Sequence, residues 1–202
     1  DYLPDLLIVE GPSAGGHLGF SFEELEGEDI PILEDLVTDV IEAIKPFEES
    51  TGRKIPVIAA GGIYDGYDID KFLKLGATGV QMGTRFVATY ECDASIEFKN
   101  AYISSKEEDI DFILSPVGMP GQAIINPFIK KVKTQKEKIT KCYNCLTPCS
   151  PVKSPYCISE ALINAVKGNV DEGLVFIGRK GYKIDKIVSV EELIHELSTV
   201  IQ

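Results

Sequence analysis

The chain carries EGPSAGGHLGF at residues 10–20, IPVIAAGGI at residues 55–63 and GVQMGTRF at residues 79–86. Each stretch contains or follows a run of β-branched and apolar residues that ends in glycine-rich sequence. Glycine has no side chain, so backbone N–H groups at such a strand end can approach an anion closely. The repeated pattern predicts parallel strands that bring their loops to one face, where a phosphate-bearing cofactor binds.

The predicted elements around these motifs alternate between strand and helix. Strands are expected over residues 6–9, 55–60 and 79–82. An amphipathic helix is expected to begin after Pro31 and to end at Pro46. A second, short helix is expected to be capped by Asp68, with Gly76 in a left-handed conformation after its end. This order, with short connections, indicates right-handed βαβ units, and therefore an α/β fold with a parallel sheet.

The regular alternation does not continue in the second half of the chain. SPVGMPGQ at residues 115–122 is interpreted as a Pro/Gly-rich connection, and a helix is expected to start at Ser154 and to end at Gly168. Ser189 and Glu192 have the spacing of a capping box for a last helix. The expected division is a first unit over residues 1–95 and a smaller, mostly helical appendage over residues 96–202.

Composition excludes several classes of partner. The chain has 202 residues, of which 44% are hydrophobic and 26% charged, as in an ordinary globular protein of one or two domains. The net charge of −12 would repel a polyanion, so nucleic acid is not expected as a partner. No apolar stretch approaches the roughly 20 residues that a bilayer span needs, and no secretory signal pattern opens the sequence. We therefore expect no membrane partner and a cytoplasmic location.

In this order, AGGH after the first strand, AAGGI after the second and QMGTRF after the third resemble the nitronate monooxygenase family. This family, also called 2-nitropropane dioxygenase-like, consists of FMN-dependent TIM barrels, and the FMN-dependent enoyl-ACP reductases share the three motifs. The resemblance covers roughly residues 5–130. It implies a (β/α)8 barrel of which this chain supplies strands six to eight, and the loops after strands seven and eight are the usual phosphate site of that fold.

The resemblance and the glycine pattern agree on an FMN site. The expected cofactor-binding residues are Glu10, Gly15, Gly61, Gly62, Gln81, Met82, Gly83 and Thr84. The amides at Gly61, Gly62 and Gly83 and the Thr84 hydroxyl would surround the phosphate. The alternative is that these glycines only make tight turns between strand and helix. Glu10 stands where many relatives have glutamine, and a carboxylate beside the flavin would disfavour its anionic reduced form. We therefore expect Glu10 to be turned away or to accept hydrogen bonds from backbone amides.

His17, in AGGH, is the candidate catalytic residue. By the resemblance it is a catalytic base or a substrate-orienting group near flavin N5, and an imidazole with an ordinary pKa of about 6.5 can accept a proton at neutral pH. A lone loop histidine is often only solvated, but the flanking glycines favour a functional role because they remove bulk that would block a ligand. The other histidine, His195, lies on a charged helix and is expected to be solvated.

The implied reaction is the oxidation of an alkyl nitronate, a small-molecule substrate, by molecular oxygen through FMN. The alternative is an NAD(P)H-dependent enoyl-ACP reductase, since the local motifs do not separate the two. A complete barrel takes about 250 residues, so five of its strands are missing here. The chain is expected to be part of a longer protein or to pair with another subunit, as a homo-oligomer for example. A non-catalytic fragment is the third hypothesis.

A serine hydrolase is a rival from another class. Gly11 to Gly15 match the G-x-S-x-G nucleophile elbow around Ser13, and Asp185 and His195 follow in hydrolase order. The elbow must lead directly into a helix, however. The glycines that follow Ser13 would each cost about 1 kcal/mol in a helix relative to alanine, so the sequence argues against this reading.

Four cysteines form a candidate metal site. Their spacing is C-x2-C-x3-C-x7-C, and they are Cys142, Cys145, Cys149 and Cys157, with Cys92 apart. Four thiolates can hold zinc or an iron–sulfur cluster. The second pair lacks C-x2-C spacing, prolines interrupt the cluster, and Cys157 is expected in the first turn of a helix. We therefore expect free thiols and no metal.

Overall fold

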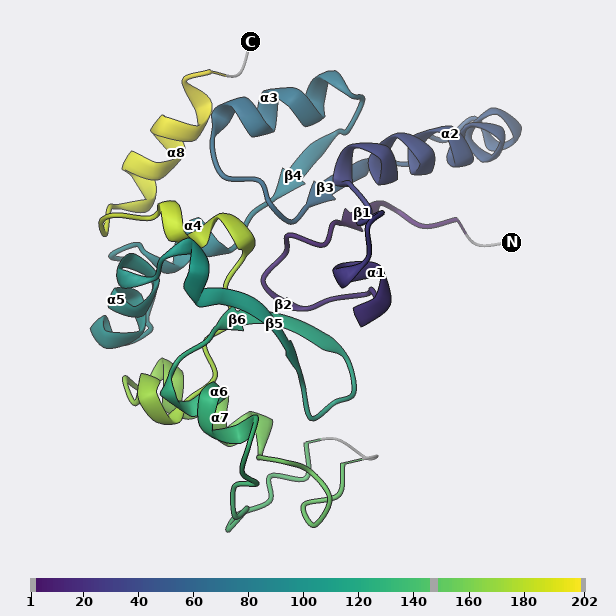
Figure 1. The fold of residues 1–202 in the computed structure, drawn as a ribbon. Helices are drawn as coiled ribbons and strands as arrows, with labels where there is room; N and C mark the ends of the chain where they lie inside the picture. Colours follow the sequence, from purple (N-terminus) through teal and green to yellow (C-terminus); the bar gives the residue numbers. More distant parts are fainter. Residues whose placement is uncertain (1–2, 146–148, 201–202) are drawn as a thin grey trace.

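The structure, a computed structural model, describes residues 3–145 and 149–200. Figure 1 shows two small sheets, one above the other, with helices around them. The upper sheet is parallel and has the order β1-β3-β4. Its strands are β1 (Leu7–Glu10), β3 (Val57–Ala60) and β4 (Gly79–Gln81). The three predicted strands and the parallel α/β pattern are thus confirmed.

Three helices cover one face of the parallel sheet. They are α2 (Leu33–Thr51), α3 (Gly66–Lys74) and α8 (Val190–Ser198). Val57 and Ala59 of β3 lie in one core cluster with Leu193 and Leu197 of α8. On the opposite face, the side chain of Ile8 is 51% exposed. Within the described residues β1 and β4 pair only with β3, so the sheet does not close into a barrel.

Helix α2 is longer than predicted. It runs through Pro46 to Thr51, so the expected end at Pro46 is wrong. Proline removes one backbone hydrogen bond, but Pro46 lies on an exposed stretch where water can satisfy the freed carbonyl. The helix ends where Gly52 takes a φ of 68°, and the Gly52 N–H donates to the Glu48 carbonyl at 2.8 Å. A left-handed glycine, rather than the proline, therefore stops this helix.

Helix α3 is capped by Asp65 and not, as predicted, by Asp68. The Asp65 side chain accepts a hydrogen bond from the Asp68 N–H at 3.0 Å. Asp68 instead accepts from the Tyr64 N–H at 2.8 Å and pairs with Lys180 at 2.7 Å. Either of two aspartates three residues apart can cap this turn, and the prediction from sequence named the wrong one. Gly76 has a φ of 104° just after the helix, as predicted.

The lower sheet is antiparallel and was not predicted. It has the order β2-β6-β5, with β2 (Gly16–His17), β5 (Ile110–Leu114) and β6 (Pro120–Ile124). The interpretation of SPVGMPGQ as a connection is therefore wrong in part, because the stretch forms the tight β5–β6 turn and then the start of β6. Proline is tolerated as the first residue of a strand, and Gly118 supplies the turn with a φ of 85°.

The remaining elements surround the lower sheet and link it to the upper one. They are α1 (Phe22–Glu26), α4 (Thr84–Val87), α5 (Ile96–Ser104), α6 (Pro127–Val132), α7 (Ile158–Val166) and the 3-10 helices η1 (Glu107–Asp109), η2 (Val170–Glu172) and η3 (Arg179–Lys183). The division near residue 95 stays a prediction, and a sheet and a core cluster join the residues on its two sides. Among the described residues, no helix combines the length and apolar character that crossing a membrane requires.

The last two helices test two further boundary predictions. Helix α7 begins at Ile158 with Cys157 as its N-cap, so the expected start at Ser154 and the placing of Cys157 in the first turn are wrong. Residues 154–156 instead form a bend, and Tyr156 packs edge-on against Phe128 with ring centroids 5.1 Å apart. At α8, the capping box of Ser189 and Glu192 is confirmed, and His195 is exposed as predicted.

Candidate functional site

One cavity of about 310 Å³ lies at the carboxyl ends of the three parallel strands. All eight residues expected around the cofactor line it: Glu10, Gly15, Gly61, Gly62, Gln81, Met82, Gly83 and Thr84. The remaining lining residues are Ser13, Ala14, Ala60, Ile63, Val87, Tyr102, Phe176, Ile177 and Gly178. Parallel strands bring their carboxyl ends to one edge of a sheet, which is why three motifs far apart in sequence meet here.

The glycines after β3 are required by the backbone. Gly61 and Gly62 have φ values of 87° and 79°, in the region that side chains rarely adopt. A Cβ on Gly61 would lie 2.9 Å from the Gly11 carbonyl oxygen, and one on Gly62 would lie 2.8 Å from the Ser13 Cβ. Both glycines therefore turn the chain and let it pack against the loop after β1. The alternative that these glycines only make tight turns between strand and helix predicts the same.

Gly83 differs from those two glycines. It has a φ of −125°, and a Cβ built there would meet no atom within 4 Å. Neither backbone conformation nor packing within the described chain requires a glycine at this position. Its missing side chain leaves open space beside the cavity and the start of α4, which is the kind of gap that a bound phosphate fills.

Thr84 and Gly15 fix the far wall of the cavity. The Thr84 Oγ1 accepts a hydrogen bond from the Gly178 N–H at 3.0 Å, and this leaves the threonine proton free to donate to a ligand. A Cβ on Gly15 would lie 2.6 Å from the Gly178 nitrogen, so only glycine allows this approach. The segment 176–178 is thereby held against the tips of the loops from β1 and β4.

Glu10 is the only carboxylate among the lining residues. Within the described chain its side chain accepts no hydrogen bond, so the expected contact with backbone amides is not found. Partial burial raises the pKa of Glu10 above its ordinary value. Burial has this effect because it disfavours the charged form of a carboxyl group.

His17 lies one side chain away from the cavity. Its ring packs edge-on against Phe176, with centroids 5.0 Å apart at 66°, and Phe176 lines the cavity while His17 does not. The His17 Nε2 lies 2.7 Å from the Ser115 Oγ. Partial burial lowers the pKa of His17, so the imidazole is neutral near pH 7. Phe176 therefore touches His17, the candidate catalytic residue, and also lines the cavity.

The structure contradicts the hydrolase alternative. The loop after Ser13 leads into strand β2 and not into a helix, so the nucleophile elbow is absent. Ser13 instead contributes to the wall of the cavity. For the cysteines, no group of three or more metal-binding side chains comes together in residues 3–145 and 149–200.

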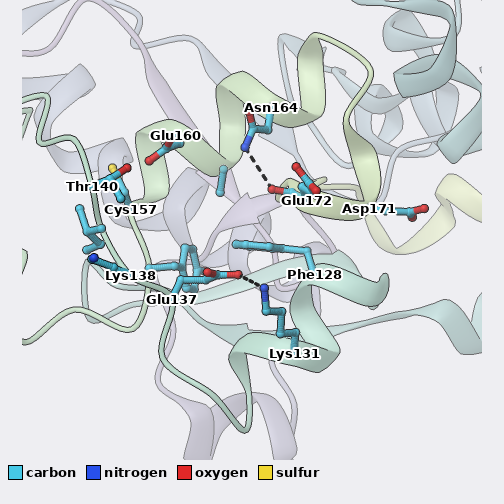
Figure 2. A pocket seen from close by; sticks show the side chains of 13 residues that line it. Phe128, Lys131, Glu137, Lys138, Thr140, Cys157, Glu160, Asn164, Asp171 and Glu172 are labelled. Atoms are coloured by element: carbon cyan, nitrogen blue, oxygen red, sulfur yellow. Dashed lines mark hydrogen bonds and ion pairs between the residues drawn. The ribbon is translucent and has the colours of Figure 1, made fainter.

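A second cavity of about 280 Å³ lies between α6, α7 and η2 (Figure 2). Several of its lining side chains are charged, and Lys131 pairs with Glu137. The Asn164 Nδ2 donates to the Glu172 carbonyl at 3.3 Å. Its lining includes no glycine and none of the residues predicted to bind the cofactor or to act in catalysis. The cavity at the strand ends is therefore the candidate functional site.

Sequence reasoning missed the segment that closes the site. LVFIG at residues 174–178 has the same pattern as the other motifs, an apolar run that ends in glycine, and this signal could have identified it. The segment lies beside β6, where the Ile177 N–H donates to the Gln122 carbonyl at 3.2 Å. Tyr102 holds it from α5, with its hydroxyl donating to the Phe176 carbonyl at 2.5 Å.

Comparisons with known proteins agree with this geometry. The family described as nitronate monooxygenase matches residues 2–199. The chain belongs to the nitronate monooxygenase family. The members of this family are flavin-dependent oxidoreductases. Their α/β fold agrees with the parallel strands and covering helices of this chain.

Individual relatives cover the chain to different extents. A probable nitronate monooxygenase of Staphylococcus saprophyticus is 37% identical over 137 residues, which are 67% of this chain and 36% of that protein. FabK from Thermotoga maritima has a TM-score of 0.70 and 29% identity, covering 96% of this chain and 53% of its own. A nitroalkane oxidase from Streptomyces ansochromogenes has a TM-score of 0.70 at 24% identity, which concerns the fold alone. The chain thus spans about half the length of these solved structures.

Proposed function

We propose that the chain forms the phosphate-binding and histidine-bearing part of an FMN-dependent nitronate monooxygenase, which oxidises alkyl nitronates with molecular oxygen. One observation carries the proposal: the eight residues expected around FMN from three separate motifs line a single cavity. Family membership supports the same assignment.

The phosphate of FMN would be held by uncharged groups. The cavity wall contains no lysine or arginine, so an anion there must be bound by backbone amides and hydroxyl groups. Gly61, Gly62, Gly83 and Thr84 supply these amides at the ends of β3 and β4, and the Thr84 hydroxyl supplies one more donor. Arg85, the one cation in the QMGTRF motif, is engaged elsewhere: it pairs with Glu196 at 2.9 Å.

The protein groups next to this site orient the substrate. The chemistry that bound FMN supplies is the acceptance of electrons from the nitronate and their transfer to oxygen. His17 contributes a neutral imidazole beside the cavity, and Phe176 and Ile177 contribute an apolar wall that excludes water. Glu10 contributes a carboxyl group whose pKa is raised by partial burial.

The flavin ring needs walls beyond those described. A cavity of about 310 Å³ is at the lower end of the range for ligand sites, roughly 300–1,000 Å³. The sheet face that carries Ile8 is uncovered, as expected when further barrel strands are supplied by a longer polypeptide or by another subunit. We therefore propose the activity for the complete barrel.

The second candidate is an NAD(P)H-dependent enoyl-ACP reductase. The three motifs are shared with the FMN-dependent members of that class, and the similarity to FabK at 29% identity favours keeping it. The third is a non-catalytic fragment that binds no flavin.

Anaerobic flavin bleaching separates these functions. The complete barrel that contains this chain is incubated with FMN and freed of excess, and its visible absorbance is followed on addition of propyl-2-nitronate or of NADH. Bleaching by the nitronate, reversed by oxygen, is the expected result. Bleaching by NADH alone would assign the reductase, and a complete barrel that retains no FMN would contradict the proposal.

A further inference from the structure

The β5–β6 turn holds His17 through one buried serine. Ser115 is 2% exposed, and its Oγ lies 2.7 Å from the His17 Nε2. The backbone of Ser115 is fixed on both sides, because its N–H donates to the Met119 carbonyl at 3.0 Å and its carbonyl accepts from the Gly118 N–H at 2.9 Å. The hydroxyl therefore meets the imidazole from a rigid turn.

The other hydrogen bonds of Ser115 indicate whether Ser115 or His17 is the donor in the bond between them. The Val117 N–H approaches the Ser115 Oγ at 3.4 Å, so the oxygen already accepts one weak hydrogen bond. If His17 also donated through Nε2, the serine proton would have no acceptor among the described residues, and an unpaired buried donor is unfavourable. If Ser115 donates to Nε2, the serine proton and the Nε2 lone pair are both satisfied. The proton of the neutral imidazole then lies on Nδ1.

The imidazole ring has a second contact, with Phe176. Gly121 lies opposite His17 in the β2–β6 pair, and a Cβ there would lie 2.9 Å from the Phe176 ring. Glycine at this position lets Phe176 pack edge-on against the imidazole. SPVGMPGQ thus provides the serine that binds Nε2 and the glycine that makes room for Phe176.

We propose that Ser115 is a positioning residue that keeps neutral His17 protonated on Nδ1, so that His17 offers a hydrogen-bond donor at that nitrogen. Among the described residues, no group hydrogen-bonds Nδ1, which is therefore free for a ligand. A nitronate already carries its negative charge on the nitro oxygens, so it needs an N–H donor and has no proton to lose. The statement about the substrate rests on the proposed function, whereas the statement about the tautomer does not.

Nitrogen NMR of the imidazoles tests the tautomer directly. The full chain, labelled with ¹⁵N and without flavin, contains two histidines, and exposed His195 is an internal control. For wild-type His17 near neutral pH we expect Nδ1 to be pyrrole-type and Nε2 pyridine-type. Ser115→Ala should shift the tautomer ratio toward Nε2–H by about fivefold, the value of one ordinary hydrogen bond, and Ser115→Thr should keep the wild-type ratio.

Two results would overturn the assignment. One is the finding that wild-type His17 is mainly protonated on Nε2. That measurement does not depend on the folding of any variant. The other is a folded Ser115→Ala protein whose His17 tautomer ratio is unchanged. Because the measurement uses no flavin, a failure of FMN to bind would overturn the proposed function and leave the tautomer result standing.

Discussion

Replacing Gly83 by alanine separates cofactor binding from folding. Its φ of −125° suits any residue, and the new methyl group would meet no protein atom within 4 Å. We therefore expect the free energy of unfolding to change by less than about 0.5 kcal/mol. The methyl group would fill the space beside the amides that hold the phosphate. Loss of one hydrogen bond to a charged group costs about 1.5–3 kcal/mol, so the Kd for FMN should rise roughly tenfold to a hundredfold.

The assay compares FMN with riboflavin, which lacks the phosphate. Quenching of flavin fluorescence on titration with the chain gives both Kd values, and thermal unfolding gives the stability. Gly83→Ala should weaken FMN binding and leave riboflavin binding unchanged. Gly19→Ala is the matched control, because a Cβ at Gly19 also meets nothing within 4 Å and Gly19 does not line the cavity.

Two outcomes would refute this reasoning. If Gly83→Ala weakened FMN and riboflavin equally, the methyl group would be acting on the ring or on the fold and not on a phosphate. If wild-type chain bound riboflavin as tightly as FMN, the strand tips would contribute no phosphate site at all.

Three further predictions follow from named contacts. Gly15→Ala places a Cβ 2.6 Å from the backbone at Ile177 and should lower stability by about 1–3 kcal/mol or more, measured by urea unfolding. Arg85→Gln removes the ion pair with half-exposed Glu196 and should cost about 0.2–1 kcal/mol with no change in FMN affinity. Because burial lowers the pKa of His17, the unfolded chain takes up its proton first on acidification. Stability should therefore fall as the pH drops through about 6.5, and His17→Gln should reduce this slope in urea midpoints measured between pH 5 and pH 8.

The sequence was sufficient for the part of the site that depends on strand ends. Gly61, Gly62 and Gly83 end apolar runs, and parallel strands necessarily bring such ends together. The motifs therefore predicted both the parallel sheet and the wall of the cavity. The predicted helix end at Pro46 and the predicted cap at Asp68 were wrong. A proline on an exposed helix and an aspartate three residues from another aspartate are both compatible with more than one helix boundary.

The sequence was not sufficient for contacts that join distant segments. The β5–β6 hairpin could not be predicted because its prolines and glycines are common in loops. Here its glycines are needed for a turn and for the approach of Phe176. Ser115 lies 98 residues from His17, and no local pattern signals their hydrogen bond. Such pairings depend on the tertiary fold, so periodicity and propensity along the chain carry no information about them.

The most direct test of the phosphate site is a ¹H–¹⁵N amide spectrum of the labelled chain recorded with increasing FMN. The proposed site predicts that the amide resonances of Gly61, Gly62, Gly83 and Thr84 move together and that riboflavin moves them less. Shifts confined to the cavity near Asn164, or equal shifts with both flavins, would contradict it.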